Sequence, residues 1–249
     1  ITDNSVAASV LNTLNSKTTV AVNATTVTTI TGTAADLITA YTANAAGTIT
    51  GLANDVVILT DATISAANLL AIDAYPYTTG VVNATAVTTI TGTASDLITA
   101  YTANAAGTIT FSTDEAITVN NSISVAQFNY LAANNDGVIT ATISEGEMAV
   151  LNGITESGNA LAITVTDTTV AATELNTLDS KTTTDLTVTS STITGLATDV
   201  LTAYTATGSI NGLGNEAVSL SDTSIDAEVL INLDALTSGI INASSINTI

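Results

Sequence analysis

The stretch that decides the fold is Val22–Thr50, VNATTVTTITGTAADLITAYTANAAGTIT, because the chain repeats it at Val82–Thr110. The second copy differs from the first only at Ala86 and Ser95. The two copies begin 60 residues apart, a spacing that composition alone does not produce. Near-identical segments at a fixed spacing are typical of folds in which each repeat packs on its neighbours. The sequence therefore predicts a repeat architecture.

The composition describes the core that such repeats bury. Hydrophobic residues make up 46% of the 249 residues, whereas aromatic residues make up only 3%. The core must then consist of Val, Ile, Leu and Ala, whose small side chains suit thin and regular layers. Together with the repeat, this composition favours an elongated array over a single globule.

The charge excludes several classes of partner. The formal net charge is −20, and the only basic residues are Lys17 and Lys181. A surface with so few cations repels nucleic acids and anionic membranes, so we expect neither as a partner. No apolar run approaches the roughly 18 residues that cross a bilayer, so we expect no membrane insertion. Cysteine is absent, which excludes a disulfide framework and fits an extracellular bacterial polymer.

A short turn motif recurs along the chain: an apolar residue, a run of Thr, Ser, Asn or Asp, and a second apolar residue five positions after the first. It occurs at Ile1–Val6, Val22–Val27, Leu59–Ile64, Val82–Val87, Val165–Val170, Val188–Ile193, Leu220–Ile225 and Ile241–Ile246, with shorter forms at Val119–Ile123 and Ile139–Ile143. These ten candidate turns are spaced by 20 to 37 residues. Short and long turns alternate within residues 1–118, which accounts for the 60-residue super-repeat, and residues 111–159 form a diverged unit.

The segments around each motif predict strands and short helices. Alternating apolar residues lead into the motifs, as at Ile163 and Val165, and predict strands. After the motif the period changes to that of an amphipathic helix. Helices are expected at Val6–Lys17, Thr33–Ala46, Ala66–Tyr75, Val125–Asn135, Val170–Lys181, Leu196–Tyr204 and Ile225–Leu236. Capping-box starts are expected at Thr33 with Asp36, Thr93 with Asp96 and Ser144 with Glu147.

These elements predict an α/β fold, a repeat solenoid with parallel strands stacked in sheets and short helices covering one face. Residues 1–249 are expected to form one elongated array of about ten turns. The chain opens and closes within a motif and lacks a starting Met and a polar capping unit, so we expect it to be a fragment of a longer chain.

The residue types argue against an enzyme. His, Cys and Arg are absent, so nucleophilic triads and most acid–base sites cannot be assembled. The remaining candidates are paired carboxylates, Glu145 with Glu147 and Asp114 with Glu115. The favoured interpretation of these four is that they are solvated loop acids or helix caps, and we expect no catalytic residue and no organic cofactor.

Calcium is the one candidate cofactor. Asp3, Asp61, Asp167 and Asp222 hold the same place in the motif, and stacked turns bring such acids near one another. Carboxylate oxygens are the ligands that calcium takes. The alternative is that these side chains form turns. A second minor hypothesis is ice binding by threonine rows that start from Thr48/Thr50 and Thr108/Thr110, against the alternative that Thr simply favours strands.

The copies ITGTA[AS]DLITAYTANAAGTIT, at Ile30–Thr50 and Ile90–Thr110, and the [TS]D-x-[TS]-[VI] turns carry a resemblance to a known class. The chain resembles the Thr-, Ala- and Val-rich tandem arrays of giant bacterial cell-surface proteins, those of marine cyanobacteria in particular. The resemblance covers the whole chain. It implies an extracellular, repetitive and non-enzymatic role, and it carries over no functional residue.

Two hypotheses of function follow. The favoured one is a structural segment of an extracellular fibre, filament or surface layer, whose partners are neighbouring repeats or further copies of itself. The alternative is a binding module, such as an adhesin arm or phage-type fibre, that contacts a glycan or a surface. The diverged unit holds Phe111 and Phe128, the residues that this alternative would use.

Overall fold

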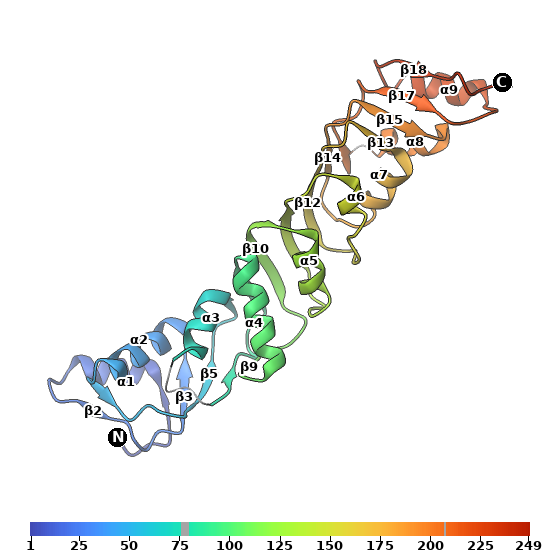
Figure 1. The fold of residues 1–249 in the computed structure, drawn as a ribbon. Helices are drawn as coiled ribbons and strands as arrows, with labels where there is room; N and C mark the ends of the chain where they lie inside the picture. Colours follow the sequence, from blue (N-terminus) through green and yellow to red (C-terminus); the bar gives the residue numbers. More distant parts are fainter. Residues whose placement is uncertain (76–79, 207) are drawn as a thin grey trace. The chain divides into compact units, whose positions relative to one another are not determined.

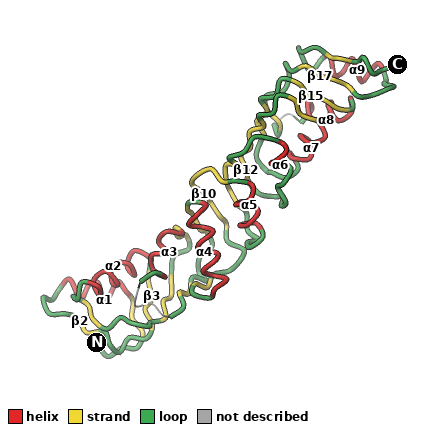
Figure 2. Tube along the Cα trace, viewed as in Figure 1, coloured by secondary structure: helices red, strands yellow, loops and turns green. Residues whose placement is uncertain are grey.

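The computed structural model describes residues 1–75, 80–206 and 208–249. These residues form two compact units, one of residues 1–121 and 130–138 and the other of residues 122–129 and 139–249. In both units short strands and short helices alternate along the chain (Figure 1, Figure 2). The expected α/β class, with parallel strands in several sheets and short helices, is confirmed. No described helix is long and apolar enough to cross a membrane.

The elements follow one another in a regular order. They are β1 (Ser5–Ala7), α1 (Ala8–Ser16), β2 (Val22–Asn23), β3 (Thr29–Gly32), α2 (Ala34–Ala45), β4 (Ile49–Thr50), β5 (Val56–Leu59), β6 (Thr63–Ser65), α3 (Ala66–Asp73), β7 (Val82–Asn83), β8 (Thr89–Gly92), α4 (Ala94–Ala106), β9 (Ile109–Thr110), β10 (Ala116–Ile123), α5 (Val125–Ala132), β11 (Ile139–Ile143), α6 (Met148–Leu151), β12 (Ala160–Val165), β13 (Thr169–Ala171), α7 (Ala172–Asp179), β14 (Leu186–Val188), β15 (Thr192–Gly195), α8 (Ala197–Thr205), β16 (Ile210–Asn211), β17 (Ala217–Leu220), α9 (Ala227–Asp234) and β18 (Ile241–Asn242). We call the stretch from the end of one helix to the end of the next a rung.

The strands pair in parallel between successive rungs. In the first unit β1, β3, β5, β7 and β9 pair in that order, β2 pairs with β4, and β8 lies between β6 and β10. In the second unit β11, β12, β14 and β16 form one series and β13, β15, β17 and β18 another. Paired residues are 20 to 27 positions apart in the sequence, from Thr140 with Ala160 to Val22 with Ile49. Each rung therefore contributes the next strand to its sheets.

The register places buried β-branched residues side by side. Val6, Ile30 and Val57 form one such row, and Ile64, Ile90 and Ile117 form another. In the second unit Val170, Ile193 and Val218 do the same. All but Val6, which lies at the sheet edge, are at most 3% exposed. Each fully buried Val or Ile side chain contributes about 1.5–3 kcal/mol, so these rows are the main source of cohesion between rungs.

The expected spacings of the short and long turns are wrong: along β1, β3, β5, β7 and β9 the paired residues lie 24, 27, 25 and 27 positions apart. No paired residues in the described ranges are more than 27 positions apart, whereas the motif spacing reached 37. The motif has two forms that do not align on their first residue. In Ile1–Val6 the register residue is Val6, which pairs with Ile30. After the motif Val22–Val27 the register residue comes three positions later, at Ile30. The turn is longer here, because the side chain of Asn23 accepts the amide of Thr25 and a further turn follows.

The sequence also missed a strand between the turn and the helix. β6, β13 and β15 occupy this place, although a helix was expected directly after each turn. Each contains one buried Ile or Val between exposed or half-buried residues, and so short a run carries no clear period. The glycine that ends β8 has a packing role. A Cβ atom at Gly92 would lie 3.1 Å from the Cβ of Ala66, at the start of the helix one rung earlier.

The helices match their predicted ranges to within a few residues at each end. The capping boxes at Thr33 and Thr93 are confirmed, since each hydroxyl accepts the amide of Asp36 or Asp96 and donates to its carboxylate. The box at Ser144 with Glu147 is wrong: Glu147 itself is the N-cap of α6, and the Ser144 hydroxyl donates to Glu145. Successive helices contact each other, α1 with α2 and α2 with α3 in the first unit (Figure 1).

Leu37 and Leu97 hold equivalent places in α2 and α4, and both are fully buried. Replacing either by Ala should cost about 2–5 kcal/mol, because the cavity left between helix and strands closes only in part. Thr39 is exposed on the same helix and bonds only to the carbonyl of Ala35, so Thr39→Ala should be nearly neutral. Chemical denaturation measures both changes in unfolding free energy.

Hydrogen exchange on the Leu37→Ala variant tests how the damage spreads. Since each rung packs mainly on its neighbours, protection should fall most in α1, α2 and α3 and least at the far end of the first unit. An equal loss throughout the first unit would contradict the rung-by-rung picture.

Candidate functional site

Three buried carboxyl groups hold the same place in three rungs. Asp55, Glu115 and Glu216 each stand directly before a strand, β5, β10 or β17. Their exposed fractions are 0%, 1% and 3%. Carboxyl groups are almost never buried in this way unless they are paired or bonded, so these three are the most unusual chemical groups of the chain.

Each buried carboxyl lies near a buried tyrosine on the preceding helix. The tyrosines are Tyr41 on α2, Tyr101 on α4 and Tyr204 on α8. The Tyr204 hydroxyl donates to Oε2 of Glu216 at 3.0 Å. Burial, joined by the nearby carboxyl charge, raises the pKa of all three tyrosines, so their hydroxyls stay protonated. Each tyrosine can therefore act only as a hydrogen-bond donor or acceptor.

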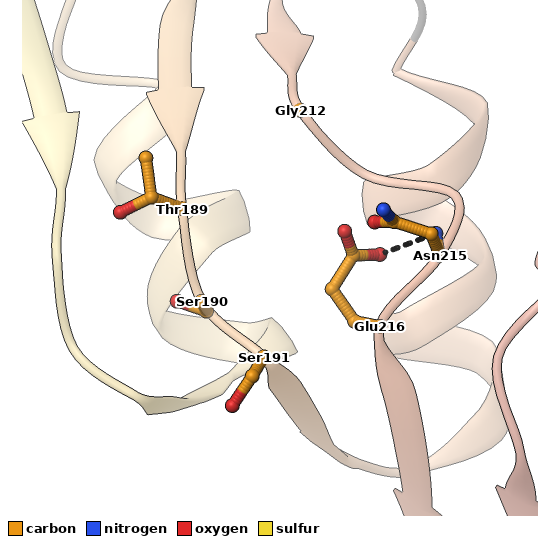
Figure 3. Close-up of a pocket in the computed structure, with 6 residues that line it drawn as sticks. All are labelled: Thr189, Ser190, Ser191, Gly212, Asn215 and Glu216. Atoms are coloured by element: carbon orange, nitrogen blue, oxygen red, sulfur yellow. Dashed lines mark hydrogen bonds between the residues drawn. The ribbon is translucent and has the colours of Figure 1, made fainter.

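Glu216 is well satisfied. Besides the tyrosine hydroxyl, Oε2 accepts the backbone amides of Gly214 at 2.8 Å and Asn215 at 3.1 Å. Figure 3 shows the bond to Asn215, with Glu216 at the edge of a pocket of about 380 Å³. The lining residues come from the β14–β15 turn and from the loop before β17, and are Thr189, Ser190, Ser191, Gly212, Asn215 and Glu216.

Asp55 and Glu115 are less well satisfied. No hydrogen bond of normal geometry reaches either carboxylate from the described residues. Burial raises the pKa of Asp55 to about 6, although the backbone amide of Ala53 offsets part of the effect. Burial raises the pKa of Glu115 to about 7, the charge of Asp114 adds to the shift, and the backbone amides of Glu115 and Ser112 oppose it. Both carboxyl groups therefore keep their proton at pH values at which an exposed carboxyl group is ionised.

A glycine of the next rung covers the backbone of each buried acid. These are Gly80, Gly137 and Gly239, and a Cβ atom at any of them would overlap the carbonyl oxygen of Asp55, Glu115 or Glu216. The chain of the next rung thus crosses directly over the acid and excludes water from it. The sequence signal for this crossing is a Gly before two apolar residues, as in Gly80-Val81-Val82.

The paired carboxylates expected from sequence separate into different roles. Asp114 is exposed and accepts the hydroxyl of Ser112, whereas Glu115 is buried. The interpretation of Glu115 as a solvated acid is therefore wrong, because the next rung covers it. Oε2 of Glu145 accepts the first amide of α5, that of Val125, at 3.2 Å, so its interpretation as a helix cap is confirmed. Glu147 is exposed.

The four aspartates considered for calcium lie at turns. Asp61, Asp167 and Asp222 each accept the first amide of the preceding rung's helix, that of Ala34, Met148 or Ala197, at 2.7–2.8 Å. Asp3 is exposed and lies ahead of α1, the first described helix. Within the described ranges, no three or more acidic side chains gather as a metal site would need. Calcium binding at these residues stays a prediction.

These bonds belong to a wider pattern that sequence reasoning missed. In α2, α4, α5, α6 and α8, a side chain from the following rung caps the first amide of the helix. The acceptors are Asp61, Asn121, Glu145, Asp167 and Asp222, which lie 19 to 27 residues after the amides they accept. Nearly the same offset separates the residues of paired strands. The strand register therefore predicts which side chain lies beside the first amide of each helix.

The other candidate binding groups are placed as follows. Phe111 and Phe128 are buried, so the diverged unit does not present them to a ligand. Thr50 of β4 lies beside Asn23 of β2, and Thr110 of β9 beside Asn83 of β7. The TxT triplets therefore do not continue as threonine rows onto these neighbouring strands.

Comparison of the chain with protein-family models, with curated proteins and with solved structures finds no match. The tyrosine–carboxyl pairs offer a buried carboxyl group, a phenol and, at Glu216, two backbone amides, and each is covered by the rung that follows it.

Gly239→Ala tests whether the crossing over the acid is as tight as described. The new methyl group overlaps the carbonyl oxygen of Glu216, so the backbone of one rung must shift, and we expect a loss of about 3 kcal/mol. Gly158→Ala is the matched control. Its Cβ meets nothing within 4 Å, and only its positive φ of 82° opposes the change, which costs about 1 kcal/mol. Equal losses in the two variants, measured by denaturation, would rule out the tight crossing.

Proposed function

We propose that this chain is a non-enzymatic structural segment, a repeat solenoid of an extracellular bacterial surface protein, fibre or filament. The observation that carries the proposal is the cap between rungs. Five helices obtain a partner for their first amide from the following rung. The polar side chains that sequence analysis singled out thus serve to join one repeat to the next.

The packing between rungs supports the same proposal. Strands pair in parallel at a nearly constant offset, and the buried rows of Val and Ile extend from rung to rung. The 60-residue repeat comprises two rungs, since α2 and α3 begin between Val22 and Val82. Repeats that meet through equivalent surfaces extend without needing a specialised site.

The chemistry of the buried groups fits a structural role. Asp55 and Glu115 are each covered by the next rung, which leaves little room for a substrate beside them. The Glu216 carboxylate lines a pocket but is already bonded to the Tyr204 hydroxyl and two backbone amides. The net charge of −20 keeps a long extracellular array soluble, and the absence of cysteine fits bacterial surface arrays of this composition. The resemblance to giant bacterial cell-surface repeats points the same way.

Inserting a further copy of residues 22–81 after Val81 tests the proposal. If the segment is a solenoid, two added rungs lengthen the particle by about 10 Å, twice the 4.7–4.9 Å between strands, at an unchanged cross-section. Sixty residues that form a separate globule would add about 25 Å, given a radius of gyration of about 10 Å. Small-angle scattering distinguishes the two lengths.

The control for this insertion is a flexible insert of the same length, which gains no helix by circular dichroism. A cooperative melting transition that shifts upward with the added repeat, together with the 10 Å increase, supports the structural array. An increase in particle length of about 25 Å would contradict the proposal.

Asp222→Ala tests the cap that carries the proposal. Loss of the acceptor for the first amide of α8 should cost about 0.5–2 kcal/mol, whereas Asp222→Asn retains an acceptor and should cost less. Asp3→Ala is the matched control, because Asp3 has the same place in the motif and lies ahead of the first described helix. Equal effects at Asp3 and Asp222 would show that the cap contributes nothing.

The same thermal melts, run with calcium and with excess chelator, separate the cap from a calcium site. If Asp222 acts through its cap alone, the Tm of the wild-type chain stays unchanged by the chelator. If the chelator lowers the Tm of the wild-type chain but not that of the Asp222→Asn variant, calcium binding at Asp222 is favoured.

A further inference from the structure

Glu115 and Glu216 hold equivalent places but differ in their hydrogen bonds. Glu216 takes the Tyr204 hydroxyl and two backbone amides. Near Glu115, the hydroxyl of Tyr101 donates instead to Oδ1 of Asn135, at 2.9 Å. Neither oxygen of Glu115 has a hydrogen bond of normal geometry within the described residues. The chain thus contains the same buried acid in a satisfied and in an unsatisfied form.

The segment that covers Glu115 is residues 134–138, which we call the crossing segment. Its contacts are few and specific. The amide of Asp136 donates to the carbonyl of Thr113 at 2.5 Å, and the carbonyl of Val138 accepts the amide of Ile117 at 2.9 Å. Gly137 passes so close to the carbonyl of Glu115 that no side chain fits there. All of these residues belong to the first unit.

The charges around Glu115 are of one sign. The loop that precedes it brings Asp114, the crossing segment brings Asp136, and α4 brings the protonated Tyr101. The chain's two lysines lie elsewhere, one after α1 and one after α7. When Glu115 ionises, no cation and no hydroxyl donor among the described residues offsets its desolvation, and Asp114 repels it further.

We propose that the contact between Glu115 and the crossing segment is a pH-sensitive joint, closed while Glu115 is neutral and opening as the solution becomes alkaline. Opening admits water to the carboxylate and separates two adjacent rungs locally. The joint at Glu216 has the same backbone contacts and stays closed, because its carboxylate is satisfied. This inference concerns one contact within the first unit and does not depend on the proposed surface role.

The sign of the effect follows from linkage. Burial raises the pKa of Glu115 in the closed joint from 4.5 to about 7, whereas in the open joint water restores the ordinary value. The closed state therefore holds its proton more tightly. Its stability is fully present below about pH 4.5 and declines as the pH rises toward 7, where the loss is nearly complete.

Hydrogen exchange measures the joint directly. We compare protection factors, which remove the intrinsic pH dependence of exchange, for residues 134–138 at pH 5 and pH 8. Protection of the crossing segment should fall on the order of tenfold between these values. In the Glu115→Gln variant, which keeps the neutral shape of the acid, protection should be the same at both pH values.

Two controls belong to the same experiment. Residues 236–240 cross over Glu216 with matching bonds, since Ser238 donates to Gly214 and Val218 donates to Ile240, so their protection should not change with pH. Asp114→Asn removes only a neighbouring exposed charge and should retain most of the pH dependence.

Constant protection of residues 134–138 from pH 5 to 8 in the wild-type chain would overturn the proposal. An equal fall in the Glu115→Gln variant, or at residues 236–240, would overturn it as well, since the fall would then have another cause. None of these outcomes depends on whether the array is a surface fibre.

Discussion

The structure depends on a bond between the first amide of a helix and a side chain of the rung that follows. Helices of 4 to 13 residues are too short to persist alone in water, and their first amides have no partner within the helix. In α2, α4, α5, α6 and α8 that partner arrives only with the next rung. Helix formation and stacking are therefore coupled, because a helix is fully capped only when the next rung is in place. The rows of buried Val and Ile stabilise the same contact between rungs.

Burial of the carboxyl groups opposes the stability of this arrangement. A row of Val and Ile would pack more simply than Asp55 or Glu115, which lose their hydration without gaining a full set of hydrogen bonds. Glu216 shows that the place can be satisfied, given a tyrosine hydroxyl and two loop amides. Near Glu115 the hydroxyl of Tyr101 donates to Asn135 instead, and near Asp55 the hydroxyl of Tyr41 has no hydrogen bond within the described residues. The buried acid is therefore satisfied only where both the hydroxyl and the loop amides point toward it.

Sequence patterns predicted the parts of the fold that repeat with a clear period. The helices and the strands that lead into the turns follow from the spacing of Leu, Ile and Val, and the capping boxes at Thr33 and Thr93 follow from local chemistry. The register did not follow, because the motif at Val22 and the motif at Ile1 look alike while Ile30 aligns with Val6. Strands as short as Thr63–Ser65 carry too few residues to show a period. The burial of Glu115 was also out of reach, since the segment that covers it lies about 20 residues later and is recognisable only by Gly137.

The nearly constant offset between paired strands has a consequence for how the chain acquires its structure. No paired residues in the described ranges are more than 27 positions apart, so every loop that must close is short compared with 249 residues. Parallel sheets usually demand distant partners and form slowly, but here the ratio of contact separation to length is about 0.1, a value more usual for helical bundles. A chain of this kind can order itself vectorially, one rung behind the emerging end, while the remainder is still being synthesised or threaded through a pore.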